Sequence, residues 1–242
     1  MELSVIVPAY KKKNCILEAI SAIDKCLTGG GISHEIIVVD DGSPDSTLKQ
    51  ALKTKVKCAT VLGYEKNKGK GNALKYGAYF AKGKFVAFAD ADLDLNPDKI
   101  PMFMKIMKDK KADIVIGSKR HPLSEVDYPL TRKILSDIYY YLFARLLFGL
   151  DVKDTQVGMK LFKRKVLYRI LERNLCKKYA FDLELLVIAK KLGYRIEEAP
   201  VELKYKFSGS GINLKSVWNM LVDTLAILYR LRILRYYDKA RQ

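Results

Sequence analysis

The sequence has 242 residues, of which 49% are hydrophobic and 29% charged, so its composition is globular and excludes a disordered chain. Lys and Arg number 44 against 27 Asp and Glu, and the formal net charge of +17 favours polyanionic partners: phosphorylated substrates, anionic lipid head groups or nucleic acid. The four cysteines form no CxxC pair and only His34 and His121 could add imidazole, which argues against a zinc site and favours free thiols in a reducing compartment.

Strand-like and helix-like segments alternate through the first half of the chain. The expected strands are residues 3–7, 35–39, 56–63, 85–89 and 112–117. Helices are expected at residues 14–27, 72–81 and 97–108. A further helix is expected to start at a cap formed by Asp45 or Ser46 and to run to residue 53. This alternation predicts an α/β fold with a mostly parallel sheet and helices on both faces.

The second half contains longer amphipathic segments. Helices are expected at residues 134–150, 181–192 and 214–231. In the last of them one stripe holds Trp218, Leu221, Val222, Leu225 and Tyr229. We expect one domain over residues 1–206 and a C-terminal amphipathic helical extension over residues 207–242.

Contact with a membrane is expected at its surface. The first residues do not resemble a signal peptide, and no apolar run approaches the roughly 20 residues that span a bilayer. Residues 134–150 and 214–235 combine apolar, tyrosine and arginine side chains, which suits helices that lie on anionic lipid. The alternative is that both helices pack into the core or into a dimer interface.

Carboxylates follow the apolar segment at residues 85–89. Asp90 and Asp92 are separated by one residue, so in extended backbone both side chains point the same way, and Asp94 continues the alternation. Oxygen ligands of this kind suit a hard cation such as Mg²⁺ or Mn²⁺ together with phosphate groups. The alternative is a solvated acidic turn in which Asp94 or Asn96 caps the next helix.

A second acidic pair, Asp40 and Asp41, also follows an apolar strand and precedes Gly42 and Ser43. In open α/β sheets, ligands bind beyond the carboxyl ends of the strands, so the two acidic clusters predict one shared site. The alternative is a simple Asp41–Gly42 turn in front of a capped helix.

Glycine and basic residues can bind anions near the same edge of the sheet. Residues 67–72 (NKGKGN) precede a helix, and glycine lets backbone amides approach an anion closely, although P-loop spacing is absent. The pairs Lys119–Arg120 and Arg132–Lys133 flank a loop, and arginine forks match phosphate oxygens. Ordinary surface charge is the alternative for both pairs.

Five motifs of the first half resemble, in order, those of family 2 glycosyltransferases with the GT-A fold: VIVPAY (5–10), VVDDGS (38–43), NKGKGNAL (67–74), DAD (90–92) and VIGSKR (115–120). The second half resembles polyprenyl-phosphate hexosyltransferases in DTQVGMKLFKR (154–164), YAFDLELL (179–186) and SGSGINL (208–214). The branch that it resembles most is dolichyl-phosphate β-glucosyltransferase, which is related to the dolichyl-phosphate mannosyltransferases. The resemblance covers nearly the whole chain and implies the GT-A fold.

The resemblance also implies a role for each matched position. The nucleotide-sugar would contact Pro8, Tyr10, Asp40, Asp41, Lys70, Gly71, Asp90, Ala91 and Gln156. Mg²⁺ or Mn²⁺ would be held by Asp90, Asp92 and Asp94. The acceptor phosphate would contact Arg120, Arg132 and Ser136. The catalytic group would comprise Asp92, Arg120, Arg132 and Asp154, the last as a positioning residue or a base.

The implied activity is inverting transfer of a hexose, with UDP-glucose favoured, from a nucleotide-sugar to dolichyl or polyprenyl phosphate. It would take place at the cytoplasmic face of the cell or ER-type membrane. An acceptor phosphate is already a nucleophile, so it needs orientation more than a base. Alternatives within the fold are GDP-mannose as donor and a non-lipid acceptor. No nucleic-acid partner is expected, because the acidic clusters repel phosphates and no recognition motif is present.

Overall fold

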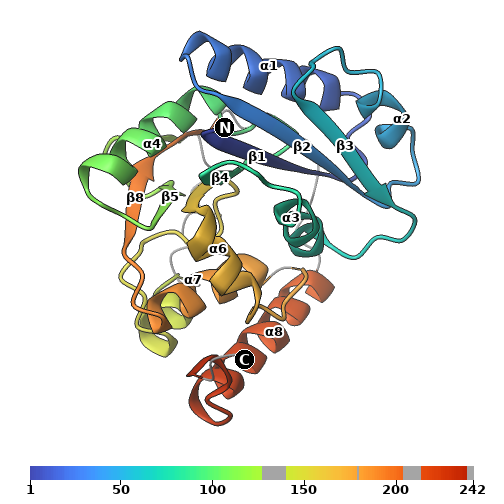
Figure 1. Ribbon diagram of the computed structural model, residues 1–242. Coiled ribbons are helices and arrows are strands. Elements are labelled where there is room, and N and C mark those ends of the chain that lie inside the picture. The colour runs from blue at the N-terminus through green and yellow to red at the C-terminus, as the bar shows by residue number, and fades with distance from the viewer. Residues whose placement is uncertain (127–139, 179, 204–213, 239–242) are drawn as a thin grey trace.

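Seven strands form one central sheet in the order β3-β2-β1-β4-β7-β5-β8 (Figure 1). The computed structural model describes residues 1–126, 140–178, 180–203 and 214–238. The strands of the sheet are β1 (Leu3–Ala9), β2 (His34–Asp41), β3 (Ala59–Tyr64), β4 (Phe85–Phe88), β5 (Ile114–Ser118), β7 (Lys160–Lys163) and β8 (Ile196–Pro200). Two short strands, β6 (Glu125–Val126) and β9 (Glu202–Leu203), pair with each other.

Strand directions confirm a mostly parallel sheet. β1 pairs in parallel with β2 and β4, β2 with β3, and β5 with β8. β7 is the exception, because it lies between β4 and β5 and runs antiparallel to both. The sequence pattern did not predict β7, which has only four residues and a lysine at each end.

Helices cover both faces because the strand side chains alternate. Val5, Val7 and Val38 pack on one face with α1 (Ile16–Gly29), α2 (Thr47–Ala51) and α4 (Ile100–Asp109). Ile6 and Ile37 pack on the other face with α3 (Lys70–Ala78), α6 (Arg164–Leu171) and α7 (Phe181–Lys191). Figure 1 shows α1 and α3 on opposite sides of the sheet. The predicted α/β architecture is therefore confirmed.

Short polar side chains fix the starts of two helices. Asn96 Oδ1 accepts a hydrogen bond from the backbone N–H of Asp98, at the start of the 3₁₀ turn η1 (Pro97–Lys99) that leads into α4. Asp45 Oδ1 accepts from the N–H of Thr47 at the start of α2. Of the predicted alternatives for these two caps, the structure selects Asn96 and Asp45.

The C-terminal segment packs against the second face through α8 (Leu214–Arg232) and the 3₁₀ turn η3 (Tyr236–Asp238). Ile227 and Tyr237 are fully buried in the same apolar cluster as α7. The expected domain boundary at residues 206 and 207 falls in the stretch 204–213, outside the described residues.

The other long helix predicted in the second half is described only in part. Residues 134–139 lie outside the described residues, and Tyr140–Leu147 form the π-helical segment η2. Among the residues that the structure describes, no helix is both long and apolar enough to cross a bilayer.

Candidate active site

A cavity of about 780 Å³ opens at the carboxyl edge of the parallel strands. β1 ends at Ala9 and is followed by Tyr10, β2 ends at Asp41, and the acidic segment follows β4. The cavity wall consists of Pro8, Ala9, Tyr10, Lys12, Asp41, Asn67, Gly69, Lys70, Asp90, Ala91, Asp92, Gln156, Lys178, Asp182 and Asn219. The site therefore lies where ligands bind in open α/β sheets.

Most residues expected at the nucleotide-sugar lie together on this wall. They are Pro8, Tyr10, Asp41, Lys70, Asp90, Ala91 and Gln156. Asp40 and Gly71 lie behind the wall and have structural contacts: the buried Asp40 carboxylate accepts from the N–H of Ser43 at 3.0 Å. A Cβ atom on Gly71 would lie 2.4 Å from the ring of Phe181, so glycine here permits α3 to pack against α7.

Asp41 orders the loop that joins β3 to α3. Its buried carboxylate accepts from the Tyr64 hydroxyl at 2.6 Å and from the backbone N–H groups of Lys68 at 2.8 Å and Gly69 at 2.9 Å. Asn67 Nδ2 donates to the same carboxylate at 2.9 Å. Burial and the bond to Asp41 raise the pKa of Tyr64. Gly69 has a φ of 98°, which other residues rarely adopt, so this position requires glycine.

Two lysines neutralise the acidic segment after β4. Lys70 Nζ lies 2.5 Å from Asp90 Oδ1, and Lys12 Nζ lies 2.9 Å from Asp92 Oδ2. Burial opposes the charge of Asp90, but the Lys70 ammonium outweighs it and lowers the pKa of that carboxyl. For Lys12, burial lowers the pKa, yet the bond to Asp92 outweighs this and raises it. The Asp90 carboxyl is therefore held in its ionised form, and both carboxylates are paired with an ammonium group at the cavity wall.

A buried ion pair lies next to the acidic segment. Lys160 is fully buried, and its Nζ lies 2.7 Å from Oδ1 of Asp182, a residue in the first turn of α7. The same ammonium group donates to the Val157 carbonyl. The charge of Lys160 also contributes to lowering the pKa of Asp90. The Asp90 and Asp182 carboxylates of the cavity wall are thus each paired with an ammonium group.

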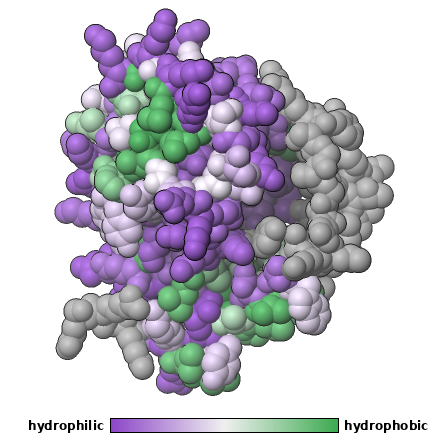
Figure 2. Space-filling view, turned by 90° about the vertical axis from the view of Figure 1, so that its right-hand side faces the viewer, coloured by the Kyte–Doolittle hydropathy of each residue, from purple (hydrophilic) through white to green (hydrophobic). Residues whose placement is uncertain are grey.

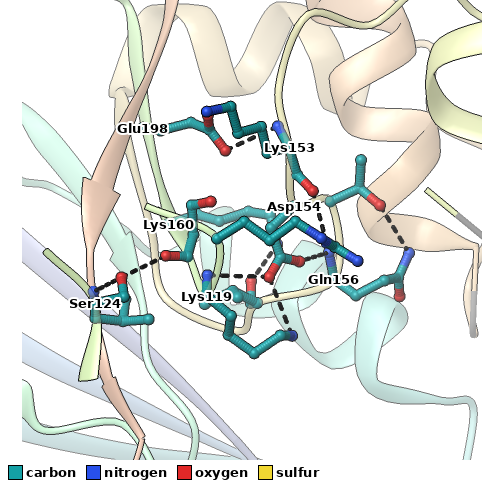
Figure 3. Close-up of polar contacts among 12 residues, drawn as sticks. Lys119, Ser124, Lys153, Asp154, Gln156, Lys160 and Glu198 are labelled. Atoms are coloured by element: carbon teal, nitrogen blue, oxygen red, sulfur yellow. Dashed lines mark hydrogen bonds and ion pairs between the residues drawn. The ribbon is translucent and has the colours of Figure 1, made fainter. Parts of the chain in front are cut away.

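Asp154 belongs to a second polar cluster (Figure 3), which meets the cavity wall at Gln156. The Asp154 carboxylate, only 3% exposed, accepts from both the backbone N–H and the Nζ of Lys119, each at 3.2 Å, and from the N–H of Gln156 at 3.1 Å. Arg120 Nη1 donates to the Lys153 carbonyl at 2.7 Å. Since Gln156 reaches the cavity wall and Asp154 holds its backbone, the geometry favours Asp154 as a positioning residue over a base.

The remaining expected residues are placed less directly. The N–H of Asp94 approaches Asp92 Oδ1 at 3.4 Å, and among the described residues the cavity wall includes neither Asp94, Asp154 nor Arg120. Arg132 and Ser136 lie outside the described residues.

Sequence reasoning missed several residues of the wall, chiefly Lys12, Lys178, Asp182 and Asn219. The signal for Asp182 was present, because it is a carboxylate in the first turn of a helix whose central residues, 185–189, are all apolar. Lys12 gave no such signal: its partner Asp92 is 80 residues away in the sequence.

The family profile described as glycosyl transferase family 2 matches residues 4–171, which is more than half of the chain. The chain belongs to glycosyl transferase family 2. Among its relatives in this family, the dolichyl-phosphate beta-glucosyltransferase of Dictyostelium discoideum is 33% identical, over 94% of this chain and 74% of the relative. The protein with that name from Drosophila melanogaster is 35% identical, over 83% of this chain and 66% of the relative. These findings confirm the family and the branch that the motifs resemble.

Solved structures show the same fold. Glucosyl-3-phosphoglycerate synthase from Mycobacterium tuberculosis, solved in complex with Mn²⁺, uridine diphosphate and glucosyl-3-phosphoglycerate, superposes with a TM-score of 0.69 at 22% identity. The match covers 94% of this family 2 chain and 78% of that chain. The GT-A fold predicted from the sequence is therefore confirmed.

Proposed function

We propose that this protein transfers glucose from UDP-glucose to dolichyl phosphate or a related polyprenyl phosphate. The observation that carries the proposal is the cavity at the strand ends, where the Asp90 carboxylate contacts Lys70 and the Asp92 carboxylate contacts Lys12. Its position matches the family 2 motifs, and the relatives named above are dolichyl-phosphate beta-glucosyltransferases.

The carboxylates of the cavity wall fit a divalent cation. Asp90 and Asp92 supply hard oxygen ligands, and both line the cavity. Each carboxylate already contacts a lysine ammonium group, so both positions attract positive charge. We assign Mg²⁺ or Mn²⁺ to them, with Asp94 nearby, and the synthase structure that contains Mn²⁺ and uridine diphosphate supports this choice. When bound, the cation supplies Lewis-acid stabilisation of the negative charge on the diphosphate.

The acceptor phosphate is proposed to attack the anomeric carbon of glucose from the side opposite the leaving group. One phosphate oxygen forms the new bond to carbon as the bond to the diphosphate breaks, and uridine diphosphate leaves with the electron pair. A phosphate monoester with a second pKa near ~6 is largely dianionic at neutral pH, so it requires no general base. The acceptor phosphate and the donor diphosphate repel each other, so the acceptor must be oriented by positive or polar groups. We assign this role to Lys70 and Lys178 on the cavity wall, to Arg120 near Asp154, and to Arg132 and Ser136.

The polyprenyl tail requires an apolar surface near the cavity, and α8 has one. Asn219 lines the cavity, and the exposed side chains of Trp218, Val222, Leu225 and Tyr229 continue along one face of the helix. We call these four residues the α8 stripe. Leu221, predicted on the same stripe, is half-buried instead.

The surroundings of the α8 stripe favour lipid. Figure 2 shows apolar atoms at the lower end of the molecule, which is the end that α8 occupies in Figure 1. Ile233 and Leu234 extend the exposed apolar surface, and the exposed Arg232 and Arg235 suit anionic head groups. We therefore propose that the protein lies on the cytoplasmic surface of a membrane, with the stripe in contact with lipid.

A donor panel tests the proposed reaction. The full chain is incubated with polyprenyl phosphate in detergent, Mg²⁺ or Mn²⁺, and UDP-glucose, UDP-N-acetylglucosamine or GDP-mannose, and glycolipid formation is measured. We expect glucolipid from UDP-glucose, at a rate at least ~10-fold above the other donors, because a site built for one base and sugar leaves polar groups unpaired with another. Preference for GDP-mannose, or transfer to water-soluble acceptors alone, would contradict the proposal.

An Asp92 variant ties that reaction to the cavity. Asp92→Asn removes the charge that is proposed to hold the cation, and we expect turnover to fall by at least ~100-fold. Asp98→Asn is the matched control, because Asp98 is an exposed carboxylate six residues away and outside the cavity wall. Equal turnover of the two variants would exclude Asp92 from the mechanism.

A further inference from the structure

Three side chains with metal-binding atoms meet at the edge of the sheet opposite the active site. Asp24 lies on α1, His34 is the first residue of β2, and Cys58 immediately precedes β3. Since β2 and β3 are parallel, their starts lie together at this edge, whereas Asp41 at the end of β2 lies at the cavity. Among the residues that the structure describes, this is the group of three such side chains whose ligand atoms all lie within 4.8 Å of one another.

The His34 ring is fixed in a ligand-like orientation. Its side chain is only 6% exposed, and Nδ1 lies 2.8 Å from the Ile32 carbonyl oxygen. Because a carbonyl only accepts, Nδ1 carries the hydrogen and donates it. Nε2 is thereby aimed at the other two side chains, 3.1 Å from Asp24 Oδ1 and 3.5 Å from Cys58 Sγ. A backbone carbonyl on the far ring nitrogen is the usual support of a metal-bound histidine.

The distances fit one tetrahedral metal ion. The third edge, from Cys58 Sγ to Asp24 Oδ1, is 3.3 Å. Zinc bonds of about 2.3 Å to sulfur and about 2.0–2.2 Å to nitrogen and oxygen place neighbouring ligands of a tetrahedron about 3.3–3.6 Å apart. The three observed separations are within about 0.3 Å of those values.

We propose that Asp24, His34 and Cys58 form a zinc-binding site that joins α1 to the starts of β2 and β3. A thiolate together with an imidazole selects zinc over the hard Mg²⁺ ion. Binding would displace the thiol proton of Cys58, and water would complete the fourth position. The Asp24 side chain is 30% exposed, so an ion can reach the site from solvent.

The sequence argued against zinc because it contains no closely spaced ligand pair. The three ligands are 10 and 24 residues apart, and only the return of the chain through α1 and β2 brings them together. The site is also independent of the proposed transferase reaction, since none of its residues lines the cavity described above.

Cobalt(II) binding to the full chain tests the proposal, with the protein kept reduced and saturated with Mg²⁺. A Cys58 thiolate bound to cobalt gives a near-ultraviolet charge-transfer band, and tetrahedral geometry gives visible d–d bands. We expect both, at one ion per chain, and displacement of cobalt by zinc. In Cys58→Ser the thiolate band should disappear, and in His34→Gln the affinity should fall at least ~10-fold.

Cys26→Ser is the matched control, because Cys26 lies two residues beyond Asp24 on the same helix and its thiol contacts the Pro97 carbonyl instead. It should keep the bands, as should Asp92→Asn at the cavity. Zinc should also raise the melting temperature of the original chain and of Cys26→Ser but not of His34→Gln. No thiolate band, or the same band in Cys58→Ser, would show that the three side chains form only a hydrogen-bonded cluster and would overturn the proposal.

Discussion

Asp90 is packed so closely that the residue facing it must be glycine. A Cβ atom on Gly158 would lie 1.8 Å from Asp90 Oδ2 and 2.5 Å from its Cγ, which no relaxed side chain tolerates. A Cβ atom at position 158 would push the Asp90 carboxylate away from the position in which it contacts Lys70. The glycine of the DTQVG motif therefore acts on the cavity through sterics.

Gly158→Ala tests this packing. Displacement of the Asp90 carboxylate should lower turnover at least ~10-fold. Overpacking should also lower the free energy of unfolding by about 1–3 kcal/mol, measured by denaturant titration. Gly29→Ala is the control, because the added Cβ would have no clashing neighbour; it should leave turnover unchanged and should not lower the free energy of unfolding. Full activity in Gly158→Ala would mean that Asp90 has room to relocate.

Asp113 links folding stability to pH. Burial opposes its charge, but bonds from Lys163 Nζ at 2.8 Å and the N–H of Arg195 at 3.0 Å outweigh this and lower its pKa. A lowered folded pKa adds stability above the unfolded pKa of about 4, and that stability disappears as pH falls through the folded value.

We therefore expect Asp113→Asn to lower the free energy of unfolding by about 1 kcal/mol at neutral pH. The difference from the original chain should shrink as the pH falls below about 4, when Asp113 itself becomes protonated. Denaturant titrations across the pH range measure it, with the exposed Asp109→Asn as control. A difference that is constant with pH would exclude the ionised carboxylate as its cause.

The residues that could be predicted are those whose position follows from the strand pattern. Asp41, Asp90 and Asp92 come directly after apolar strands, and the topology rule for parallel sheets places them at one edge. The residues that could not be predicted owe their place to contacts distant in sequence, as Lys160 does to Asp182 and Lys12 to Asp92. In a sequence with 44 Lys and Arg residues, nothing near Lys12 or Lys160 distinguishes these two lysines from the other basic residues.

At the scale of elements, the strands and helices of the first half agree with their predicted ranges to within a few residues, because each has clear apolar periodicity. β7 is different: Lys160 is fully buried, so the strand lacks an apolar pattern at its first position. That lysine is tolerated because Asp182 and a carbonyl compensate its charge in the fold. The short sequence of β7 contains no trace of that compensation.

Glu184 on α7 connects the catalytic body to the C-terminal helix. The carboxylate is fully buried, and Oε1 accepts from Arg230 Nη2 at 2.9 Å and from the Tyr237 hydroxyl at 2.5 Å. Oε2 accepts from the N–H groups of Leu175 at 2.8 Å and Cys176 at 2.6 Å. One side chain thus joins α7, α8, η3 and the loop before α7.

Glu184→Gln should detach α8 for two reasons. The amide lacks the charge that pairs with Arg230, and its NH₂ group would face groups that themselves donate hydrogen bonds to Glu184. Breaking a buried pair of this kind costs about 3–5 kcal/mol of unfolding free energy. Asp238→Asn is the control: its ion pair with Lys191 joins η3 to α7 at the surface and should contribute less than about 1 kcal/mol. Protease cleavage within α8 should increase in Glu184→Gln alone, and equal resistance of both variants would contradict the role of Glu184.

At the scale of the whole molecule, the cavity, the exposed apolar surface and the net positive charge all fit the proposed reaction at a membrane surface. One side of α8 packs against the core through the buried Ile227 and through Leu228 and Leu231. The other side presents the α8 stripe, which begins next to Asn219 of the cavity wall. The formal charge of +17 exceeds what a donor diphosphate and one acceptor phosphate require. The proposed anionic membrane surface, which would carry the acceptor, would account for both the charge and the exposed stripe.

Trp218 allows this arrangement to be measured, because it is the sole tryptophan of the sequence and lies 67% exposed on the α8 stripe. With vesicles that contain anionic lipid, its fluorescence should shift to the blue as the ring leaves water. The shift should weaken as salt reduces the Debye length from about 10 Å at 0.1 M to about 3 Å at 1 M. Leu225→Asp should weaken vesicle binding at least ~10-fold, since a buried leucine contributes about 1.5–3 kcal/mol. Leu52→Asp is the control: Leu52 follows the last residue of α2 and is comparably exposed, so this variant should bind as the original chain does. If both variants bind equally well, or if neutral vesicles produce the same shift, the α8 stripe is not the surface that meets the membrane.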